Sequence, residues 1–350
     1  MKDPYSSQDF ADQVIAFSLA YQRENLLRRG MGFEHLRELL LRLARPLLRR
    51  GANLAYAGNW LESEDNFTYI LLRLISAEQE DGFNWKSATA NNEEDKSENK
   101  PKRITGKLYN HSPWPQYCDI TPKTEAQWIN CCRIVRIMPH HAGLEDETLA
   151  AARKKGEGMP LYTAVMLSTM RRLMMDEMYL PNPYDQENKE RIPPVMARIL
   201  LGGKVDSYTG FMPGIFEEAL VTYQKKRPLY ILGGFGGAAE ILTKAITEPG
   251  RQGLEQLTLA WQMKHNAALR LLLDAASRYT LPATYAFAGD LLEQLLEFVH
   301  EAREQPALTL NTGLDDKETK LLMTTRDTAT AVKLVQEGLQ RQHALSPLPG

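Results

Sequence analysis

Two apolar, strand-like runs in the middle of this sequence end in clusters of glycine. The cluster residues are Gly202, Gly203 and Lys204 after the first run, and Gly233, Gly234, Phe235, Gly236 and Gly237 after the second. At the carboxyl ends of parallel strands, glycines let backbone N–H groups approach an anionic group beside the start of a helix. Because a helix is indicated after each run, we predict that both clusters bind an anionic ligand.

The same glycines also have an ordinary interpretation as tight turns. Neither cluster fits the Gly-x-Gly-x-x-Gly pattern with an acidic residue about 20 positions later, and neither fits the Gly-Lys-Ser/Thr ending of a P-loop. The sequence therefore disfavours an ordinary NAD dehydrogenase or an NTPase. Gly58 and Asn59 follow another short strand-like run, and we expect them at the same site.

Two adjacent carboxylates, Glu217 and Glu218, follow Pro213 and Gly214 in the first turn of a predicted helix. The helix dipole alone favours acidic residues there. Neighbouring helix residues point in different directions, so one carboxylate can face a ligand while the other packs or is solvated. A carboxylate facing the ligand would bind ribose hydroxyls or, if the protein is an enzyme, assist the departure of a base. Pro213 and Gly214 are predicted to contact the ligand.

Arg171 and Arg172 lie in a predicted helix over residues 161–178 that is otherwise rich in Leu, Met and Ala. A guanidinium group in apolar surroundings needs an anionic partner or must extend to solvent. Two partners are open at this point, a protein carboxylate in a structural ion pair and the phosphate of a ligand.

The overall composition excludes several classes of protein. The chain has 350 residues, of which 43% are apolar and 25% charged, and its formal net charge of −2 gives no long-range attraction for nucleic acid. It lacks the run of about 18 apolar residues that spans a membrane, and an odd number of cysteines suits a reducing, cytoplasmic location. The histidines and cysteines lack metal-ligand spacing, so we expect no metal and no cofactor.

Strand-like and helical segments alternate after residue 51, which predicts an α/β fold. We expect a Rossmann-like, mostly parallel sheet with helices on both faces and extra helices at the N- and C-terminal ends. Residues 1–50 are predicted to form leading helices, residues 51–341 the ligand-binding domain and residues 342–350 a tail. Residues 84–103 are rich in charge and amide groups, which predicts a mobile surface insertion. We also expect long helices over 253–279 and 284–305, followed by a closing strand at 321–324 and a closing helix at 328–341.

The arginine pair, the glutamate pair and the glycine loops together resemble the SLOG superfamily. This group contains the Lonely Guy phosphoribohydrolases, the DprA fold and the ligand-sensing N-terminal domains of TRPM channels. The Lonely Guy pattern has an Arg-Lys pair on a helix, a strand ending in Pro-Gly-Gly-x-Gly-Thr-x-Glu-Glu and a strand after Lys-Pro. Similar segments here are Met170-Arg171-Arg172, Pro213-Gly214-Ile215-Phe216-Glu217-Glu218 and Arg227-Pro228-Leu229-Tyr230.

The likeness covers residues 30–341, and its glycine loops resemble the branches found in prokaryotic conflict and antiphage systems. The second segment lacks the central glycines and the threonine that hold phosphate in the hydrolases. The resemblance therefore implies a sensor or regulator that binds a nucleotide or a derivative of ADP-ribose or NAD in a defence or stress system. The long helices predicted over 253–279 and 284–305 would suit an oligomer interface, so we expect a homo-oligomer, and we also expect a partner effector protein. Two alternatives are an N-glycoside hydrolase, using Glu217 or Glu218, and a structural subunit of an assembly.

Overall fold

A single parallel sheet forms the centre of the molecule. The computed structural model describes residues 10–89, 106–145, 158–182, 185–250, 253–279, 281 and 288–345. The strands of the sheet are β1 (Val14–Ala20), β2 (Asn53–Ala55), β3 (Leu108–Pro113), β4 (Cys132–Ile137), β7 (Val195–Gly202) and β8 (Leu229–Leu232). Their order is β4-β3-β2-β1-β7-β8, and every neighbouring pair is parallel. This arrangement confirms the predicted Rossmann-like α/β class.

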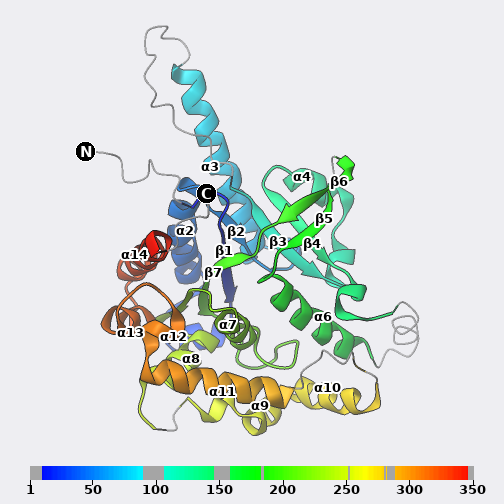
Figure 1. Cartoon of the computed structure of the whole chain (residues 1–350), viewed down its shortest axis with the longest axis vertical. Helices are drawn as coiled ribbons and strands as arrows, with labels where there is room; N and C mark the ends of the chain where they lie inside the picture. The colour runs from blue at the N-terminus through cyan, green and yellow to red at the C-terminus, as the bar shows by residue number, and fades with distance from the viewer. Residues whose placement is uncertain are drawn as a thin grey trace.

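Helices cover both faces of the sheet (Figure 1). One face packs against α2 (Phe33–Arg49), α3 (Phe67–Thr89), α13 (Asp316–Thr324) and α14 (Thr328–Leu345). The other face packs against α6 (Met159–Leu173), α7 (Gly214–Gln224), α8 (Gly237–Thr247), α10 (Ala267–Arg278) and α11 (Ala288–Glu304). The far end of α3 stands out from the rest of the molecule. The strands are apolar on both sides because neither face meets water.

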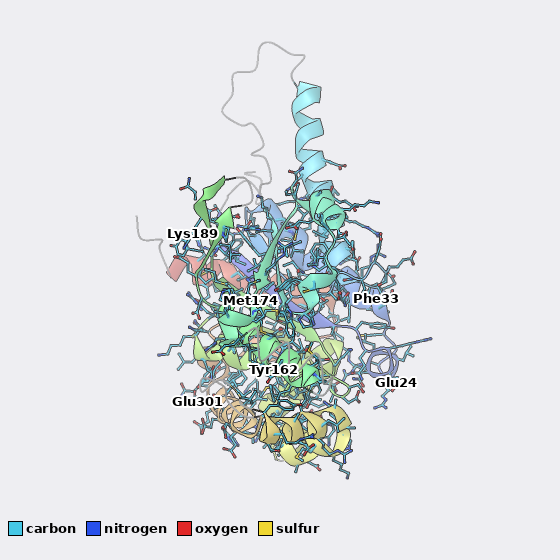
Figure 2. All side chains as sticks on the ribbon, turned by 90° about the vertical axis from the view of Figure 1, so that its right-hand side faces the viewer. Glu24, Phe33, Tyr162, Met174, Lys189 and Glu301 are labelled. Carbon is cyan, nitrogen blue, oxygen red and sulfur yellow. The ribbon has the colours of Figure 1, made fainter. Side chains whose placement is uncertain are left out.

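Tyr162 on α6 and Met174 directly after it are buried in the core between this helix and the sheet, and Figure 2 labels both. The remaining helical segments are α1 (Arg23–Leu27), α4 (Pro122–Trp128), α9 (Leu259–His265) and α12 (Pro306–Leu310), together with short 3-10 turns. An antiparallel hairpin of β5 (Met178–Asn182) and β6 (Asp185–Ile192) connects α6 to β7. The sequence indicates only a proline-punctuated connection there.

The expectation of helices throughout residues 9–50 is wrong at residues 14–20. Helices α1 and α2 do form, but residues 14–20 are strand β1, which pairs with β2 on one side and β7 on the other. All seven residues of β1 are buried or nearly so, and a continuous apolar run carries no period that separates strand from helix. The leading segment therefore contributes a central strand to the same sheet as the later strands.

Two further predicted elements differ from the structure. The closing strand at residues 321–324 is wrong, because these residues end α13, which starts at an N-cap Asp315 in a capping box with Glu318. The single helix over 253–279 is interrupted at Asn266, whose side chain caps α10 by accepting from the N–H of Ala268 at 3.2 Å. Of the predicted insertion, residues 84–89 belong to α3, and residues 90–103 lie outside the described residues.

Candidate ligand-binding crevice

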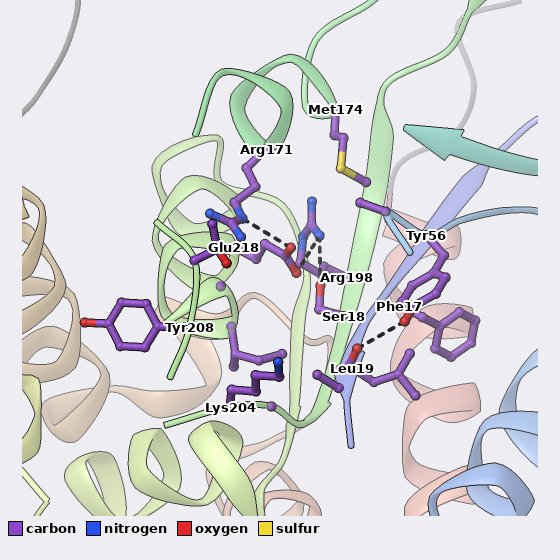
Figure 3. A pocket seen from close by; sticks show the side chains of 16 residues that line it. Phe17, Ser18, Leu19, Tyr56, Arg171, Met174, Arg198, Lys204, Tyr208 and Glu218 are labelled. Carbon is purple, nitrogen blue, oxygen red and sulfur yellow. Dashed lines mark hydrogen bonds and ion pairs between the residues drawn. The ribbon is translucent and has the colours of Figure 1, made fainter. Parts of the chain in front are cut away.

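The strand order reverses between β1 and β7, and a cavity opens at their carboxyl ends. Ala20 at the end of β1 lies beside Gly202 at the end of β7. In open parallel sheets this switch point is where ligands bind, because the connections from the two strands run in opposite directions and leave a crevice. The cavity has a volume of about 190 Å³. Figure 3 shows its side chains, which come from β1, α6, β7 and α7 and from the segments that follow β2, α6 and β7.

Two guanidinium groups hold one carboxylate inside this crevice. The Nε of Arg171 lies 3.5 Å from Oε1 of Glu218, and Nη1 of Arg198 lies 3.3 Å from Oε2 of the same carboxylate. Arg171 also pairs with Glu217, which accepts a hydrogen bond from the hydroxyl of Ser168. Arg171 therefore bridges both glutamates, and Glu218 is shared by two arginines.

Arg198 extends from the middle of β7 and is completely buried. Its Nε donates to Oγ1 of Thr222 at 2.9 Å, and its Nη1 donates to Oγ of Ser18 at 2.9 Å. Burial lowers the pKa of Arg198, and the Glu218 carboxylate opposes that shift. A buried guanidinium is costly without such partners, so the surrounding hydroxyls and carboxylate fix its position.

The start of α7 lies against the guanidinium of Arg171. A Cβ atom at Gly214, the first residue of α7, would lie 2.8 Å from Nη2 of Arg171. The N-cap residue, Pro213, offers no side-chain cap to this helix. A side chain at this position would displace the Arg171 guanidinium, which lies beside the positive end of the helix. Together the helix end and the arginines favour an anion in the crevice.

Two tyrosines line the crevice, and both hydroxyl groups are engaged. Tyr56 donates to the carbonyl oxygen of Leu19 at 3.3 Å, and Tyr208 donates to Oε1 of Gln262 at 2.7 Å. Burial raises the pKa of Tyr208 to about 12, and burial together with the Glu218 carboxylate raises the pKa of Tyr56. Both phenols are therefore neutral around pH 7 and act through their rings and hydrogen bonds.

The structure brings together only part of the predicted site. The predicted residues that line the crevice are Arg171, Gly203, Lys204, Gly214 and Glu218. Gly202 and Pro213 directly adjoin this set in the chain. Glu217 is 3% exposed and lines a separate cavity of about 270 Å³ together with the exposed Arg172. The two glutamates therefore point to different sides, and only Glu218 faces the crevice.

The glycine cluster after β8 is not brought to the crevice. A Cβ atom at Gly234 would lie 1.8 Å from the carbonyl oxygen of Thr325, and one at Gly233 would lie 2.1 Å from Oγ1 of Thr243. Phe235 is buried in the core beneath α2 and α14. Gly236 approaches Arg29, and a Cβ atom at Gly237 would lie 2.4 Å from the carbonyl carbon of Gly202. These glycines chiefly allow close packing between elements.

Gly58 and Asn59 also have a packing and capping role in the structure. A Cβ atom at Gly58 would lie 2.1 Å from the ring of Tyr56. The side-chain oxygen of Asn59 accepts from the N–H of Leu61 at 3.0 Å and from Nδ2 of Asn66 at 2.9 Å. This turn leads into α3 and positions Tyr56, so it supports the crevice from outside.

Sequence reasoning missed Arg198, which is the most deeply buried charge of the site. A signal was available, because Arg198 is the only charged residue in the strand sequence Val-Met-Ala-Arg-Ile-Leu-Leu-Gly. A charged residue within a buried strand is rare unless it is paired. Ser18 carried no such signal, because a single serine in an apolar run is common.

The chain belongs to the SLOG superfamily. A family model described as SLOG cluster2 matches residues 9–181 and 189–322, which is nearly the whole chain. Membership implies a domain that binds a nucleotide-related ligand or that is glycosylase-like. No curated protein matches the chain. Among the described residues, no helix is both long and apolar enough to cross a membrane, and no three or more His, Cys, Asp or Glu side chains gather in a way that would hold a metal ion.

Proposed function

We propose that this protein is a sensor that binds a nucleotide or a nucleotide-derived signal in the crevice between β1 and β7. The observation that carries the proposal is the shared carboxylate of Glu218 between Arg171 and Arg198. Arginine recognises phosphate through paired, charge-assisted hydrogen bonds, and a carboxylate accepts from ribose hydroxyls. One phosphate and one ribose would therefore find both kinds of partner here.

The size of the crevice supports a ligand that is only partly enclosed. Pockets that enclose a whole drug-sized ligand have volumes of about 300–1,000 Å³, whereas this cavity has a volume of about 190 Å³. The ribose phosphate end of a nucleotide would enter, and the base would lie beyond the loop after β7. Lys204 on that loop is exposed, and its side chain has no ion pair or hydrogen bond among the described residues. Its charge is therefore available to a phosphate.

The regulatory role rests on two features. Arg171 pairs with the Glu218 carboxylate, so an arriving phosphate would replace a carboxylate partner and change the pairing at the start of α7. The glycine loops resemble those of SLOG branches in antiphage systems, which supports a prokaryotic defence or stress pathway with a partner effector that responds to this change.

A hydrolase is the second candidate, because Glu218 lines the crevice. As an acid or base it would assist departure of the base from a nucleotide or an NAD-like substrate. Glu217 is the weaker candidate for this role, since it faces the neighbouring cavity and is held by Ser168 and Arg171.

Binding and turnover can be separated in one experiment. The purified protein is incubated with NAD, ADP-ribose and AMP, and both the melting temperature and the release of free base are followed. A sensor shows a raised melting temperature without base release. Base release that disappears in Glu218→Gln would establish the hydrolase instead.

A matched pair of lysine variants tests whether the crevice is the binding site. Lys204→Gln should weaken binding of the stabilising ligand about two- to tenfold, because one exposed charge near phosphate is lost. Lys320→Gln removes an exposed charge from α13, which does not line the crevice, and should leave affinity unchanged. Equal affinities of both variants and wild type would place the ligand elsewhere.

A further inference from the structure

Two of the residues that the sequence singled out, Arg172 and Glu217, line a second cavity instead of the crevice. Their neighbours in the chain, Arg171 and Glu218, line the crevice. Adjacent residues on a helix point in different directions, so α6 and α7 each present one of their charged side chains to either cavity. Helix α11 also contributes to the lining of the second cavity, and we call this space the α11 cavity.

Arg172 gives the α11 cavity a positive charge that is available to a ligand. Its side chain is exposed and has no ion pair or hydrogen bond among the described residues. The other charged groups of the lining are engaged, since Lys225 pairs with Asp176 and Glu217 pairs with Arg171. A guanidinium attracts an anion, but the Glu217 carboxylate would repel a second negative charge. The α11 cavity therefore suits a group with one negative charge better than a phosphate dianion.

Apolar and amide side chains form much of the remaining lining. Met175, Val221 and Leu291 supply apolar surface. The Nε2 of Gln224 donates to Oε1 of Gln294 at 2.7 Å, which joins α7 to α11 at this cavity. The volume is about 270 Å³, just below the range of about 300–1,000 Å³ that encloses drug-sized ligands. A small molecule with an apolar body fits this space.

Two contacts connect the α11 cavity with the crevice. Glu217 in the α11 cavity pairs with Arg171, whose Nε lies 3.5 Å from Oε1 of Glu218 in the crevice. The sulfur of Met175, which also lines the α11 cavity, accepts from Nη2 of Arg198 at 3.5 Å. Both guanidinium groups of the crevice therefore contact a residue of the α11 cavity.

We propose that the α11 cavity binds a small organic acid, in which one carboxylate is attached to an apolar body, and that this acid lowers the affinity of the crevice for its nucleotide ligand. The carboxylate pairs with Arg172, and the body packs on the apolar side chains. The added negative charge on the Glu217 side of Arg171 holds that guanidinium away from a phosphate in the crevice, and the two anions also repel each other. Because coupling between two binding sites is reciprocal, the nucleotide weakens binding of the acid by the same factor. The carboxylate site stands by itself, whereas the coupling rests on the proposed function.

Ligand-observed NMR titrations with isovalerate and phenylacetate, at constant ionic strength, test the carboxylate site. Both acids should bind, and isoamyl alcohol, which resembles isovalerate without the charge, should bind at least about threefold more weakly. Arg172→Gln should weaken isovalerate binding about three- to tenfold, because one charge-assisted contact is lost. Arg73→Gln, which removes an exposed arginine from α3, is the control and should change nothing. Binding of neither acid, or equal binding by Arg172→Gln and the wild type, overturns the site.

The coupling is measured by titrating AMP with and without saturating isovalerate. Isovalerate should weaken AMP binding about fivefold or more, and this effect should disappear in Arg172→Gln. An AMP affinity that isovalerate leaves unchanged overturns the coupling. If isovalerate binds through Arg172 but the chain binds neither AMP nor ADP-ribose, the proposed function fails and the carboxylate site remains. If AMP binds and neither acid does, this inference fails and the proposed function remains.

Discussion

The carboxyl ends of β7 and β8 have similar sequences but different surroundings. Both strands end in paired glycines before a helix. The end of β7 lies beside β1 at the switch point, where Gly203 and Lys204 line the crevice. The end of β8 lies at the edge of the sheet, where Gly234 packs against the backbone of Thr325. A glycine-ended strand can therefore be expected to bind a ligand only where the strand order opens a crevice beside it.

The largest expected effect is at the β8 end, where close packing has no space for a side chain. Gly234→Ala should lower the free energy of unfolding by at least about 3 kcal/mol, because the added Cβ meets a backbone carbonyl that cannot rotate away. Urea denaturation measures this. Gly289→Ala on α11 is the control, since its Cβ would meet only Cδ2 of Leu259, at an ordinary contact distance of 3.6 Å, and should cost less than about 0.5 kcal/mol. If Gly234→Ala were as stable as the wild type, the packing role assigned to the glycines after β8 would be wrong.

At the β7 end the dominant interactions are buried ion pairs. Arg198→Met should lower the free energy of unfolding by about 3 kcal/mol, because Ser18 and Thr222 lose their partner and Glu218 loses one of two cations. Combining it with Glu218→Gln should cost less than the sum of the single variants. A loss below about 1 kcal/mol for Arg198→Met would show that this guanidinium is not held by the network.

Ligand affinity should depend on the side chains that line the crevice at the carboxyl end of β7, such as Arg171, and not on the glycines after β8. Arg171→Lys should weaken nucleotide binding by about 1–3 kcal/mol, because lysine cannot make the bidentate contact. Arg171→Ala should also make affinity less dependent on salt. Titration of both variants at two ionic strengths checks this. Unchanged affinity throughout would make Arg171 structural and would assign the phosphate to another group.

The buried His111 on strand β3 should make the free energy of unfolding depend on pH. Burial, together with the charge of Arg198, lowers the pKa of His111 to about 3. The ordinary pKa of histidine is about 6.5, so below that pH the unfolded chain binds a proton at this residue while the folded chain does not. The stability that the folded protein gains from a neutral His111 is therefore complete above pH 6.5 and is lost as the pH falls towards 3. The slope reaches at most about 1.4 kcal/mol per pH unit.

Urea denaturation at pH 7, 6 and 5 should show this slope in the wild type and a smaller one in His111→Gln. His300→Gln is the control, because His300 is exposed on α11. A slope that persists in His111→Gln would assign it to other groups.

Local signals in the sequence were sufficient for much of the fold. The strand-like runs expected before Gly58, up to Gly202 and before Gly233 are β2, β7 and β8, and the helices indicated after the last two are α7 and α8. These predictions succeed because turn residues and apolar periodicity are local properties. The hairpin of β5 and β6 was missed, because its prolines and charged residues hide the strand pattern. Strand β1 was taken for helix, because it is apolar on both faces.

For the site, the sequence by itself determined which side chains carry chemistry, including Arg171, Glu218 and Lys204, and that glycines follow two strands. Only the tertiary structure decided which of these meet. The order of strands placed β7 and not β8 beside β1 and brought Arg198 to the crevice from a buried strand. The packing of α7 decided that Glu218, and not Glu217, faces the crevice. Strand order depends on contacts between segments far apart in the chain, and no local pattern encodes it. Arg198 and Ser18, for example, are separated by 180 positions, and Arg171 and Glu217 by 46.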